Sequence, residues 1–277
     1  MGRGVVDCRL VFRSGGEPLR VELGRGVVVG GGRPVVVAGP CSVESEEMIV
    51  ETALFLKKLL VDGLGVPFVL RGGAWKPRTS PYSFQGHGEK ALVWLREAGD
   101  RAGVPVATEV MDPRHVGLAA EYVDVLWVGA RSMQNTPLLR ELARTGKPVL
   151  LKRHFGATVN EWLCAAEYLL AGGNERVVLV ERGTRGFNEY ARFSLDITVV
   201  PVVKEVSRLP LLVDVSHPAG RRSLVPSLAA AALAAGADGI MVEVHPRPGE
   251  ALSDAKQQLD FPAAEEMFRG LKGRGLL

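Results

Sequence analysis

Cationic and hydroxyl side chains gather in a short stretch that follows an apolar run. The run at residues 66–70 is bounded by turn residues and is typical of a buried strand. After it come two glycines, a proline and five polar side chains: Arg71, Lys76, Arg78, Thr79 and Ser80. Guanidinium, ammonium and hydroxyl groups together are suited to bind phosphate or carboxylate. A solvated basic loop would have a similar composition. The anion site is favoured because comparable groups follow other apolar runs.

Polar side chains recur directly after most of the later apolar runs. They are Glu109, Arg131, Lys152, Arg153, His154, Arg182, Arg185, Asp214, His217, Glu243, His245 and Asp254, and Cys41 follows the first run. Singly, each has a structural interpretation; Lys152 or Arg182, for example, could cap a helix or pair with Glu181. Five or more cations at one mouth would repel one another in the absence of an anion. The pattern therefore predicts an anionic, phosphorylated substrate.

A second set of residues in the same positions is suited to bind a metal. Cys41, His217, Glu243 and Asp254 offer a thiolate, an imidazole and two carboxylates, a mixed set that suits Mn, Fe, Co or Zn. These residues show no local spacing motif, so the residues alone leave metal binding open. A bound metal would polarise a carbonyl oxygen. We interpret His245 as structural, because it would point to the opposite strand face from Glu243.

The elements that must position these groups alternate along the chain. Apolar, β-branched runs lie at 35–38, 68–70, 104–107, 125–128, 149–151, 177–180, 211–213 and 240–242. Helical patterns follow them at 46–60, 89–102, 114–120, 138–145, 159–171, 197–207, 225–235 and 263–271. Eight such units predict a closed (β/α)8 TIM barrel over residues 34–277, in which the ends of all strands converge on one mouth.

Residues 1–33 differ from this pattern. The segments 8–12 and 19–23 flank Ser14-Gly15-Gly16-Glu17-Pro18, which predicts a β-hairpin. About thirty residues are too few for an independent domain, so we expect a lid on one end of the barrel. The three cysteines are an odd number in a long chain and do not indicate a disulfide framework. Cys8 is expected in the hairpin and Cys164 in the core of a helix.

Composition excludes several classes of partner. The chain has 277 residues, 47% of them hydrophobic, and a formal net charge of only +3, which does not suggest binding to nucleic acid or a membrane surface. It contains neither a secretory apolar region nor a run long enough to span a membrane. A cytoplasmic location is therefore expected.

Eight separated motifs of this chain resemble those of a known enzyme family. They are Val37–Glu44, Leu70–Gly86, Gly129-Ala130-Arg131, Leu151-Lys152-Arg153, Glu181–Arg185, Asp214–Pro218, Val242–Pro246 and Leu252–Gln257. In this order they resemble 3-deoxy-D-arabino-heptulosonate 7-phosphate (DAHP) synthase, most closely its short type Iβ form. The resemblance covers the chain from about Pro34 to its end. It implies the condensation of phosphoenolpyruvate with erythrose 4-phosphate, the first step of the shikimate pathway to the aromatic amino acids.

The resemblance also implies a role for each position. Cys41, His217, Glu243 and Asp254 match the family's metal ligands, with manganese the most expected ion. Arg131, Lys152 and Arg182, beside Ala130, match contacts to the phosphate of phosphoenolpyruvate, and Arg71 and Lys76 match residues near its carboxylate. Arg78, Thr79 and Ser80 fall in the segment that holds the aldose phosphate. Glu109 matches a carboxylate near the reacting carbon and its water, and Lys76 is a candidate proton donor.

The sequence leaves three alternatives open. A 3-deoxy-D-manno-octulosonate 8-phosphate synthase would use arabinose 5-phosphate, but such relatives carry Lys-Ala-Asn-Arg-Thr-Ser where this chain has Lys76-Pro77-Arg78-Thr79-Ser80. The missing asparagine favours the four-carbon sugar. A barrel that only binds phosphate or metal should have a damaged ligand set, and here the set is intact. A Schiff-base aldolase could use Lys152, which ends a strand.

The resemblance also bears on assembly and regulation. The family commonly forms homotetramers, and many members carry a regulatory domain at one end. The segment 1–33 is too short for such a domain and the chain stops at Leu277, so we expect no inhibition by aromatic amino acids.

Overall fold

The computed structural model describes residues 8–277 and contains a closed barrel of eight parallel strands. The barrel strands are β3 (Val35–Gly39), β4 (Phe68–Arg71), β5 (Val106–Glu109), β6 (Val125–Val128), β7 (Val149–Lys152), β8 (Val177–Glu181), β9 (Leu211–Asp214) and β10 (Gly239–Glu243). Each pairs with its neighbours in chain order, and β10 closes the ring on β3. All residues of these strands are buried, because helices cover the outside and side chains fill the inside. The predicted (β/α)8 barrel is confirmed.

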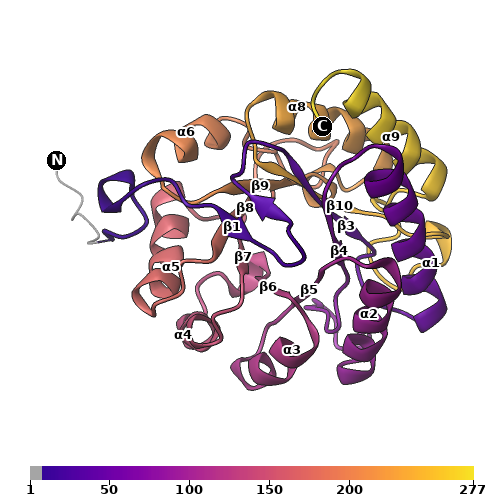
Figure 1. The fold of residues 1–277 in the computed structure, drawn as a ribbon, viewed down its shortest axis with the longest axis horizontal. Helices are drawn as coiled ribbons and strands as arrows, with labels where there is room; N and C mark the ends of the chain where they lie inside the picture. The colour runs from indigo at the N-terminus through magenta and orange to yellow at the C-terminus, as the bar shows by residue number, and fades with distance from the viewer. Residues whose placement is uncertain (1–7) are drawn as a thin grey trace.

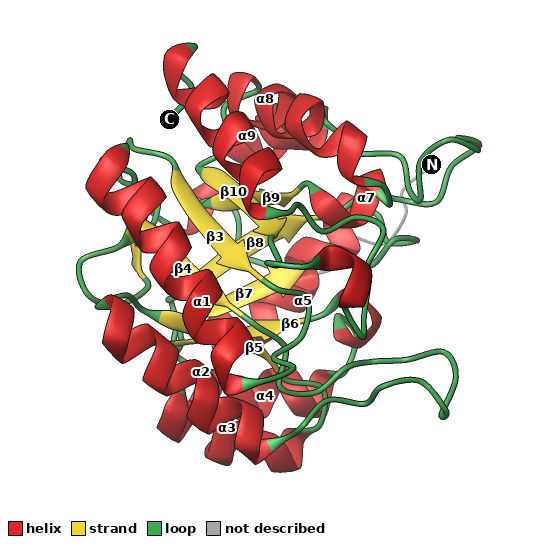
Figure 2. Ribbon diagram, turned by 90° about the vertical axis from the view of Figure 1, so that its right-hand side faces the viewer, coloured by secondary structure: helices red, strands yellow, loops and turns green. Residues whose placement is uncertain are grey.

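Helices surround the barrel and follow the strands, as Figures 1 and 2 show. They are α1 (Glu46–Leu56), α2 (Glu89–Ala102), α3 (Val116–Tyr122), α4 (Thr136–Arg144), α5 (Val159–Ala171), α6 (Val199–Val206), α7 (Ser216–Ala219), α8 (Val225–Ala234) and α9 (Phe261–Gly273). Several begin at side-chain caps, among them the Thr158–Glu161 capping box of α5. Within the described residues no helix is both long and apolar enough to cross a membrane.

The strands extend further towards the mouth than the apolar runs predict. Six of the eight end on an ionisable residue that lies just beyond the predicted run: Arg71, Glu109, Lys152, Glu181, Asp214 and Glu243. A last strand residue has its direction fixed by the pleat, whereas a loop residue does not. These side chains are therefore held by the rigid part of the fold.

The N-terminal hairpin forms with a different pairing from the predicted one. The antiparallel strands are β1 (Val21–Glu22) and β2 (Val28–Val29), and the turn runs through Gly24, Arg25 and Gly26, all with positive φ. The turn was predicted at residues 14–18, but Ser14 and Gly15 belong to a 3₁₀ turn (Arg13–Gly15) that precedes the hairpin. The turn was misplaced because the Gly-Arg-Gly signal lies between two short strands that carry little apolar alternation. Residues 1–7 of the predicted extension lie outside the described residues.

The hairpin closes the end of the barrel at which the strands begin, and Figure 1 shows it across the centre of the ring. Its apolar side chains join the cluster that fills the barrel interior, which includes Val35, Val125 and Trp127. Arg176, directly before β8, donates to the backbone oxygen of Glu22 at 3.0 Å. The predicted lid therefore lies opposite the mouth and leaves the mouth free.

The interpretation of the cysteines is wrong in one respect. Cys8 and Cys164 form a disulfide that links the N-terminal segment to α5. Nearby, the Glu167 carboxylate accepts from the backbone N–H groups of Arg9, Leu10 and Val11, each at 2.9 Å. The pairing was missed because the two cysteines are 156 residues apart, and the sequence gives no sign that residues 8–11 lie against this helix. Cys41 is the free cysteine and is buried.

Candidate active site

A cavity of about 270 Å³ opens at the mouth where the strands end. The predicted site residues that line it are Arg71, Lys76, Arg78, Thr79, Ser80, Glu109, Ala130, Arg131, Lys152, Arg182, His217 and Asp254. Cys41 and Glu243 lie beside this cavity, fully buried. Cationic side chains outnumber the carboxylates of the lining, so the cavity attracts anions.

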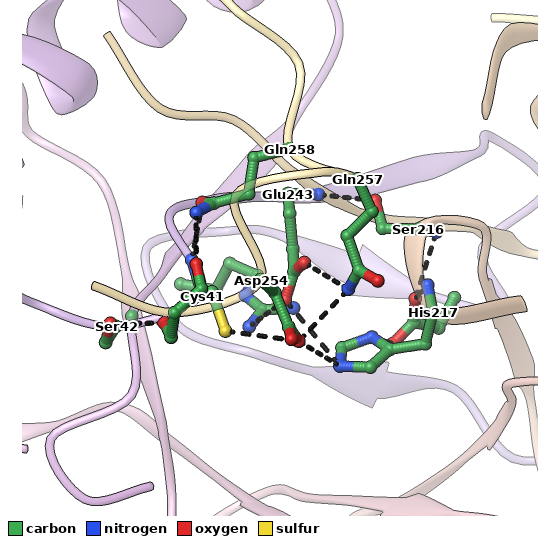
Figure 3. A network of polar contacts seen from close by, with 12 residues as sticks. Cys41, Ser42, Ser216, His217, Glu243, Asp254, Gln257 and Gln258 are labelled. Atoms are coloured by element: carbon green, nitrogen blue, oxygen red, sulfur yellow. Dashed lines mark hydrogen bonds and ion pairs between the residues drawn. The ribbon is translucent and has the colours of Figure 1, made fainter. Parts of the chain in front are cut away.

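The four predicted metal ligands converge at one side of this cavity (Figure 3). Ligand atoms of Cys41, Glu243 and Asp254 all lie within 4.8 Å of one another. His217 Nε2 lies 3.7 Å from Glu243 Oε1 and 3.7 Å from Asp254 Oδ2. Asp254 adopts a φ of 47°, a left-handed conformation that aspartate tolerates better than most residues. A thiol, an imidazole and two carboxylates gathered at the inner side of a cavity fit a divalent transition metal.

The protonation of these groups reflects their burial. Burial, with a further contribution from the Glu243 carboxylate, raises the pKa of the Cys41 thiol to about 12. Burial also lowers the pKa of His217, so the imidazole is neutral, the form in which it can ligate a metal. The thiol, in contrast, must release its proton to become a ligand.

Asp214 connects the metal-ligand set to the cationic part of the cavity. Its Oδ2 atom lies 2.7 Å from Lys152 Nζ and 2.7 Å from His217 Nδ1, and its side chain is fully buried. Its Oδ1 atom accepts from the backbone N–H groups of Ser216 and His217 at 3.2 and 3.1 Å. Burial alone would raise the pKa of Asp214, but His217 and Lys152 hold it well below its usual range. The anionic carboxylate therefore orients His217 with Nε2 towards the ligand set.

Arg71 and Lys76 lie between the metal-ligand set and the cavity. Arg71 is fully buried, with Nη2 3.3 Å from Glu243 Oε1 and its guanidinium carbon 4.9 Å from the Trp127 ring centroid. Its Nε and Nη1 atoms are buried without a hydrogen-bond partner among the described residues, although buried donors are usually paired. Lys76 Nζ donates to the Cys41 carbonyl at 3.0 Å.

The pKa of Lys76 is set by opposing effects. Burial favours the neutral amine, but Cys41 and the carboxylates of Glu109 and Glu243 outweigh it and raise the pKa. Lys76 is therefore an ammonium group at neutral pH. An ammonium group among carboxylates can donate a hydrogen bond or a proton to an oxygen that gains charge.

The predicted phosphate contacts form a separate cationic group. Arg182 is buried, its guanidinium carbon lies 4.3 Å from the Phe193 ring centroid, and its Nη1 atom has no partner among the described residues. Arg131 donates to the Pro77 carbonyl at 2.7 Å, which connects this group to the loop after β4. Further along that loop, Thr79 and Ser80 are exposed at the rim.

Glu109 depends on a neighbouring glycine for its place. A methyl group at Gly129 would lie 1.9 Å from Glu109 Oε1, well inside contact distance. Gly129 adopts an ordinary extended conformation with φ of −66°, so alanine causes no backbone strain there. Glycine at this position therefore provides space for the carboxylate.

Gly129→Ala is expected to displace the Glu109 carboxylate and to lower turnover at least about tenfold, as a misplaced group near the reacting atoms does. Stability should change little, because the flexible end of Glu109 can rotate away. Gly117→Ala, in α3 with no atom within 4 Å of the added methyl, is the matched control. Steady-state kinetics and thermal unfolding of both variants test this, and turnover equal to that of the control would contradict it.

Some residues predicted at the mouth lie elsewhere. Arg153 is buried in ion pairs with Glu181 at 3.1 Å and Asp196 at 3.0 Å, so its role is structural. His154 and Arg185 contact the Phe155 ring and do not line the cavity. His245, interpreted as structural, is buried with Nε2 3.7 Å from Glu44 Oε2.

Several residues of the site were not predicted. Arg192 and Phe193, in the long loop after β8, and Phe155, in the loop after β7, line the cavity. Gln257 contacts two of the metal-ligand residues. The length of the loop after β8 was the only signal for Arg192 and Phe193, and a glutamine carries no signal of this kind.

Comparison with known proteins agrees with the geometry. The DAHP synthetase I family matches residues 18–273 of this chain. A curated relative, phospho-2-dehydro-3-deoxyheptonate aldolase of Thermotoga maritima, is 51% identical over 256 residues, which cover 92% of this chain and 74% of the relative. A 2-dehydro-3-deoxyphosphooctonate aldolase of Desulfosudis oleivorans is 33% identical over 262 residues, covering 88% of this chain and 92% of that relative.

A solved structure is similar over nearly the whole chain. The crystal structure of phospho-2-dehydro-3-deoxyheptonate aldolase (DAHP synthase) from Thermotoga maritima matches with a TM-score of 0.91 and 47% sequence identity. The match covers 98% of this chain and 77% of that one. The barrel, the converging polar side chains and these matches together lead to one conclusion: the protein belongs to the DAHP synthetase I family.

Proposed function

We propose that this protein condenses phosphoenolpyruvate with erythrose 4-phosphate and water to give DAHP and inorganic phosphate, the reaction that opens the shikimate pathway. One observation carries the proposal. His217 and Asp254 line a cationic cavity and lie close to the buried Cys41 and Glu243, so an anionic substrate can lie beside the groups that would hold a metal. Membership of the family and the similarity to a DAHP synthase support the same reaction.

In this proposal the cations divide between the two substrates. Arg131, Lys152 and Arg182 hold the phosphate of phosphoenolpyruvate, and the unpartnered nitrogens of Arg71 receive its carboxylate beside Lys76. The aldose phosphate lies at the rim with Arg78, Thr79 and Ser80. Fixed cations hold the two reactants together and stabilise the phosphate as it leaves, without reorganisation of water.

The residues then assist the bond changes in both substrates. Lys76 donates a hydrogen bond or a proton to the aldehyde oxygen as C3 of phosphoenolpyruvate bonds to the aldehyde carbon. Water adds at C2, where positive charge develops, with Glu109 taking one of its protons. The C2–O bond to phosphate then breaks as the new hydroxyl group becomes the C2 carbonyl, and the second proton of the water passes to the departing phosphate. Cys41, His217, Glu243 and Asp254 would hold a divalent ion, Mn most expected and Fe, Co or Zn possible, which supplies Lewis-acid polarisation of the aldehyde.

The second candidate is the condensation with arabinose 5-phosphate, because relatives named as octulosonate enzymes match at 33–35% identity. The loop Lys76–Ser80 lacks the asparagine typical of those enzymes, which favours the shorter sugar. Phosphoenolpyruvate consumption should be measured with erythrose 4-phosphate and with arabinose 5-phosphate in parallel. Faster turnover with the four-carbon sugar is expected, and preference for arabinose 5-phosphate would overturn the assignment.

A Schiff-base mechanism on Lys152 is not favoured. Burial lowers the pKa of Lys152, which would suit a nucleophilic amine, but its Nζ atom donates a hydrogen bond to Asp214 at 2.7 Å.

We further propose a cytoplasmic homotetramer in which residues 34–277 form the catalytic barrel and residues 1–33 an extension.

A further inference from the structure

Gln257 lies among the four predicted metal ligands without being one of them. It is only 2% exposed, and its amide nitrogen donates to Glu243 Oε2 at 2.7 Å and to Asp254 Oδ2 at 3.2 Å (Figure 3). One buried amide therefore bridges two carboxylates, one at the end of β10 and the other in the loop that follows. Without such a donor, the two carboxylates would repel each other.

The neighbours of Gln257 dictate which way its amide points. Ionised carboxylates only accept hydrogen bonds, so Nε2 must face Glu243 and Asp254. The Arg192 guanidinium only donates, and its Nη1 atom contacts Gln257 Oε1 at 3.1 Å. A flipped amide would turn its oxygen towards two anions and its nitrogen towards a cation. Arg192 thus fixes the orientation in which Gln257 serves the carboxylates.

These contacts distinguish the two oxygens of Glu243. Oε2 accepts from Gln257, whereas Oε1 lies 3.7 Å from His217 Nε2 and 3.3 Å from Arg71 Nη2. Glu243 therefore presents a particular oxygen to the imidazole that belongs to the same ligand set. Rotation of the carboxylate would break the short hydrogen bond from Gln257.

The next residue has a matching role on the opposite side. Gln258 is buried, its Oε1 atom accepts from the Cys41 backbone N–H at 2.9 Å, and its Nε2 atom donates to the Ser253 carbonyl at 2.9 Å. These two bonds tie the loop that carries Cys41 to the loop that carries Asp254. Consecutive glutamines therefore fix side chains and backbone of the same ligand set.

We propose that Gln257 is a positioning residue of the metal site, which holds Glu243 and Asp254 in the arrangement a divalent ion requires, with Arg192 fixing its amide. The inference rests on the proposed metal-dependent function and extends it to a residue that does not bind the metal. Removal of a residue that hydrogen-bonds to a metal ligand commonly lowers the metal affinity.

The test measures metal affinity in Gln257→Met, which replaces the amide by an apolar side chain of similar length. EDTA-treated, desalted protein is titrated with Mn²⁺ in competition with a chromophoric chelator. Binding is expected to weaken roughly 10–100-fold. The matched control is Gln134→Met, at an exposed position, which should bind Mn²⁺ as the wild type does. Wild-type or tighter affinity in Gln257→Met would overturn the inference.

Turnover and stability separate positioning from a merely structural role. At saturating Mn²⁺ the variant should recover turnover near the wild-type value, because the ion itself then holds the carboxylates. Low turnover at saturating Mn²⁺ together with a lower Tm of the metal-free protein would contradict positioning. If Gln257→Met does not fold, Gln257→Asn takes its place with the same expectation, since its amide is too short to span both carboxylates. Failure of the wild type to bind Mn²⁺ would contradict the proposed function instead.

Discussion

Asp214→Asn is expected to lower turnover roughly 10–100-fold, as loss of the carboxylate behind a metal-binding histidine does. The substitution keeps the Oδ1 acceptor for Ser216 and His217, so the local backbone can remain in place. An amide nitrogen, however, would replace the oxygen that lies 2.7 Å from both Lys152 Nζ and His217 Nδ1. His217 would lose its orienting partner, and the Lys152 ammonium group would lose the carboxylate with which it forms an ion pair.

The same change should lower the free energy of unfolding by roughly 3 kcal/mol, because a buried ammonium group loses its partner. Asp62→Asn is the matched control, since Asp62 is exposed and its ion pair with Lys57 lies at the surface. That variant should remain within about 0.5 kcal/mol of the wild type. Urea denaturation and steady-state kinetics test both variants. Wild-type turnover in Asp214→Asn would contradict a role for Asp214 in holding Lys152 and His217 for the reaction.

Lys76→Met is expected to reduce turnover on the order of 10²–10⁴-fold, the usual contribution of a positioned acid or base. Lys76 is buried at the mouth, donates to the Cys41 carbonyl at 3.0 Å and lines the cavity. Methionine keeps most of the apolar stem, so the loss should reflect the missing ammonium group. The effect should appear in kcat more than in KM if Lys76 acts mainly on the transition state.

The exposed Lys58 provides the control for Lys76, and Lys58→Met should keep wild-type turnover. Rapid mixing that follows phosphoenolpyruvate absorbance would give kcat and KM for both variants. A Lys76→Met enzyme with unchanged kcat and raised KM would assign Lys76 to substrate binding and remove it from the proton transfer proposed above.

The sequence predicts the barrel well because its strands are continuous apolar runs. Burial on both faces requires such runs, and eight of them alternating with helices leave few possible arrangements. Strand ends are harder to predict, since Lys152 and Asp214 are charged yet continue the ladder. Because these residues belong to the strands, the pleat directs their side chains into the mouth. The hydrophobic pattern ends before them and therefore does not predict this direction.

Two arginines that follow neighbouring strands show why the site could be predicted only in part. Arg182 lines the cavity, whereas Arg153 is buried in ion pairs with Glu181 and Asp196. Both arginines follow an apolar run, and their roles differ because acidic side chains lie next to Arg153. Long-range partners of this kind, like the disulfide between Cys8 and Cys164, depend on the packing of distant segments.

The most direct test of the account is the metal dependence of the condensation. Protein treated with EDTA and desalted should consume phosphoenolpyruvate with erythrose 4-phosphate only at a residual rate, and Mn²⁺ should restore turnover. The physical reason is that Cys41, His217, Glu243 and Asp254 can contribute Lewis-acid polarisation only through an ion that they hold. Full turnover by the metal-free protein, with no response to added Mn²⁺, would contradict the account.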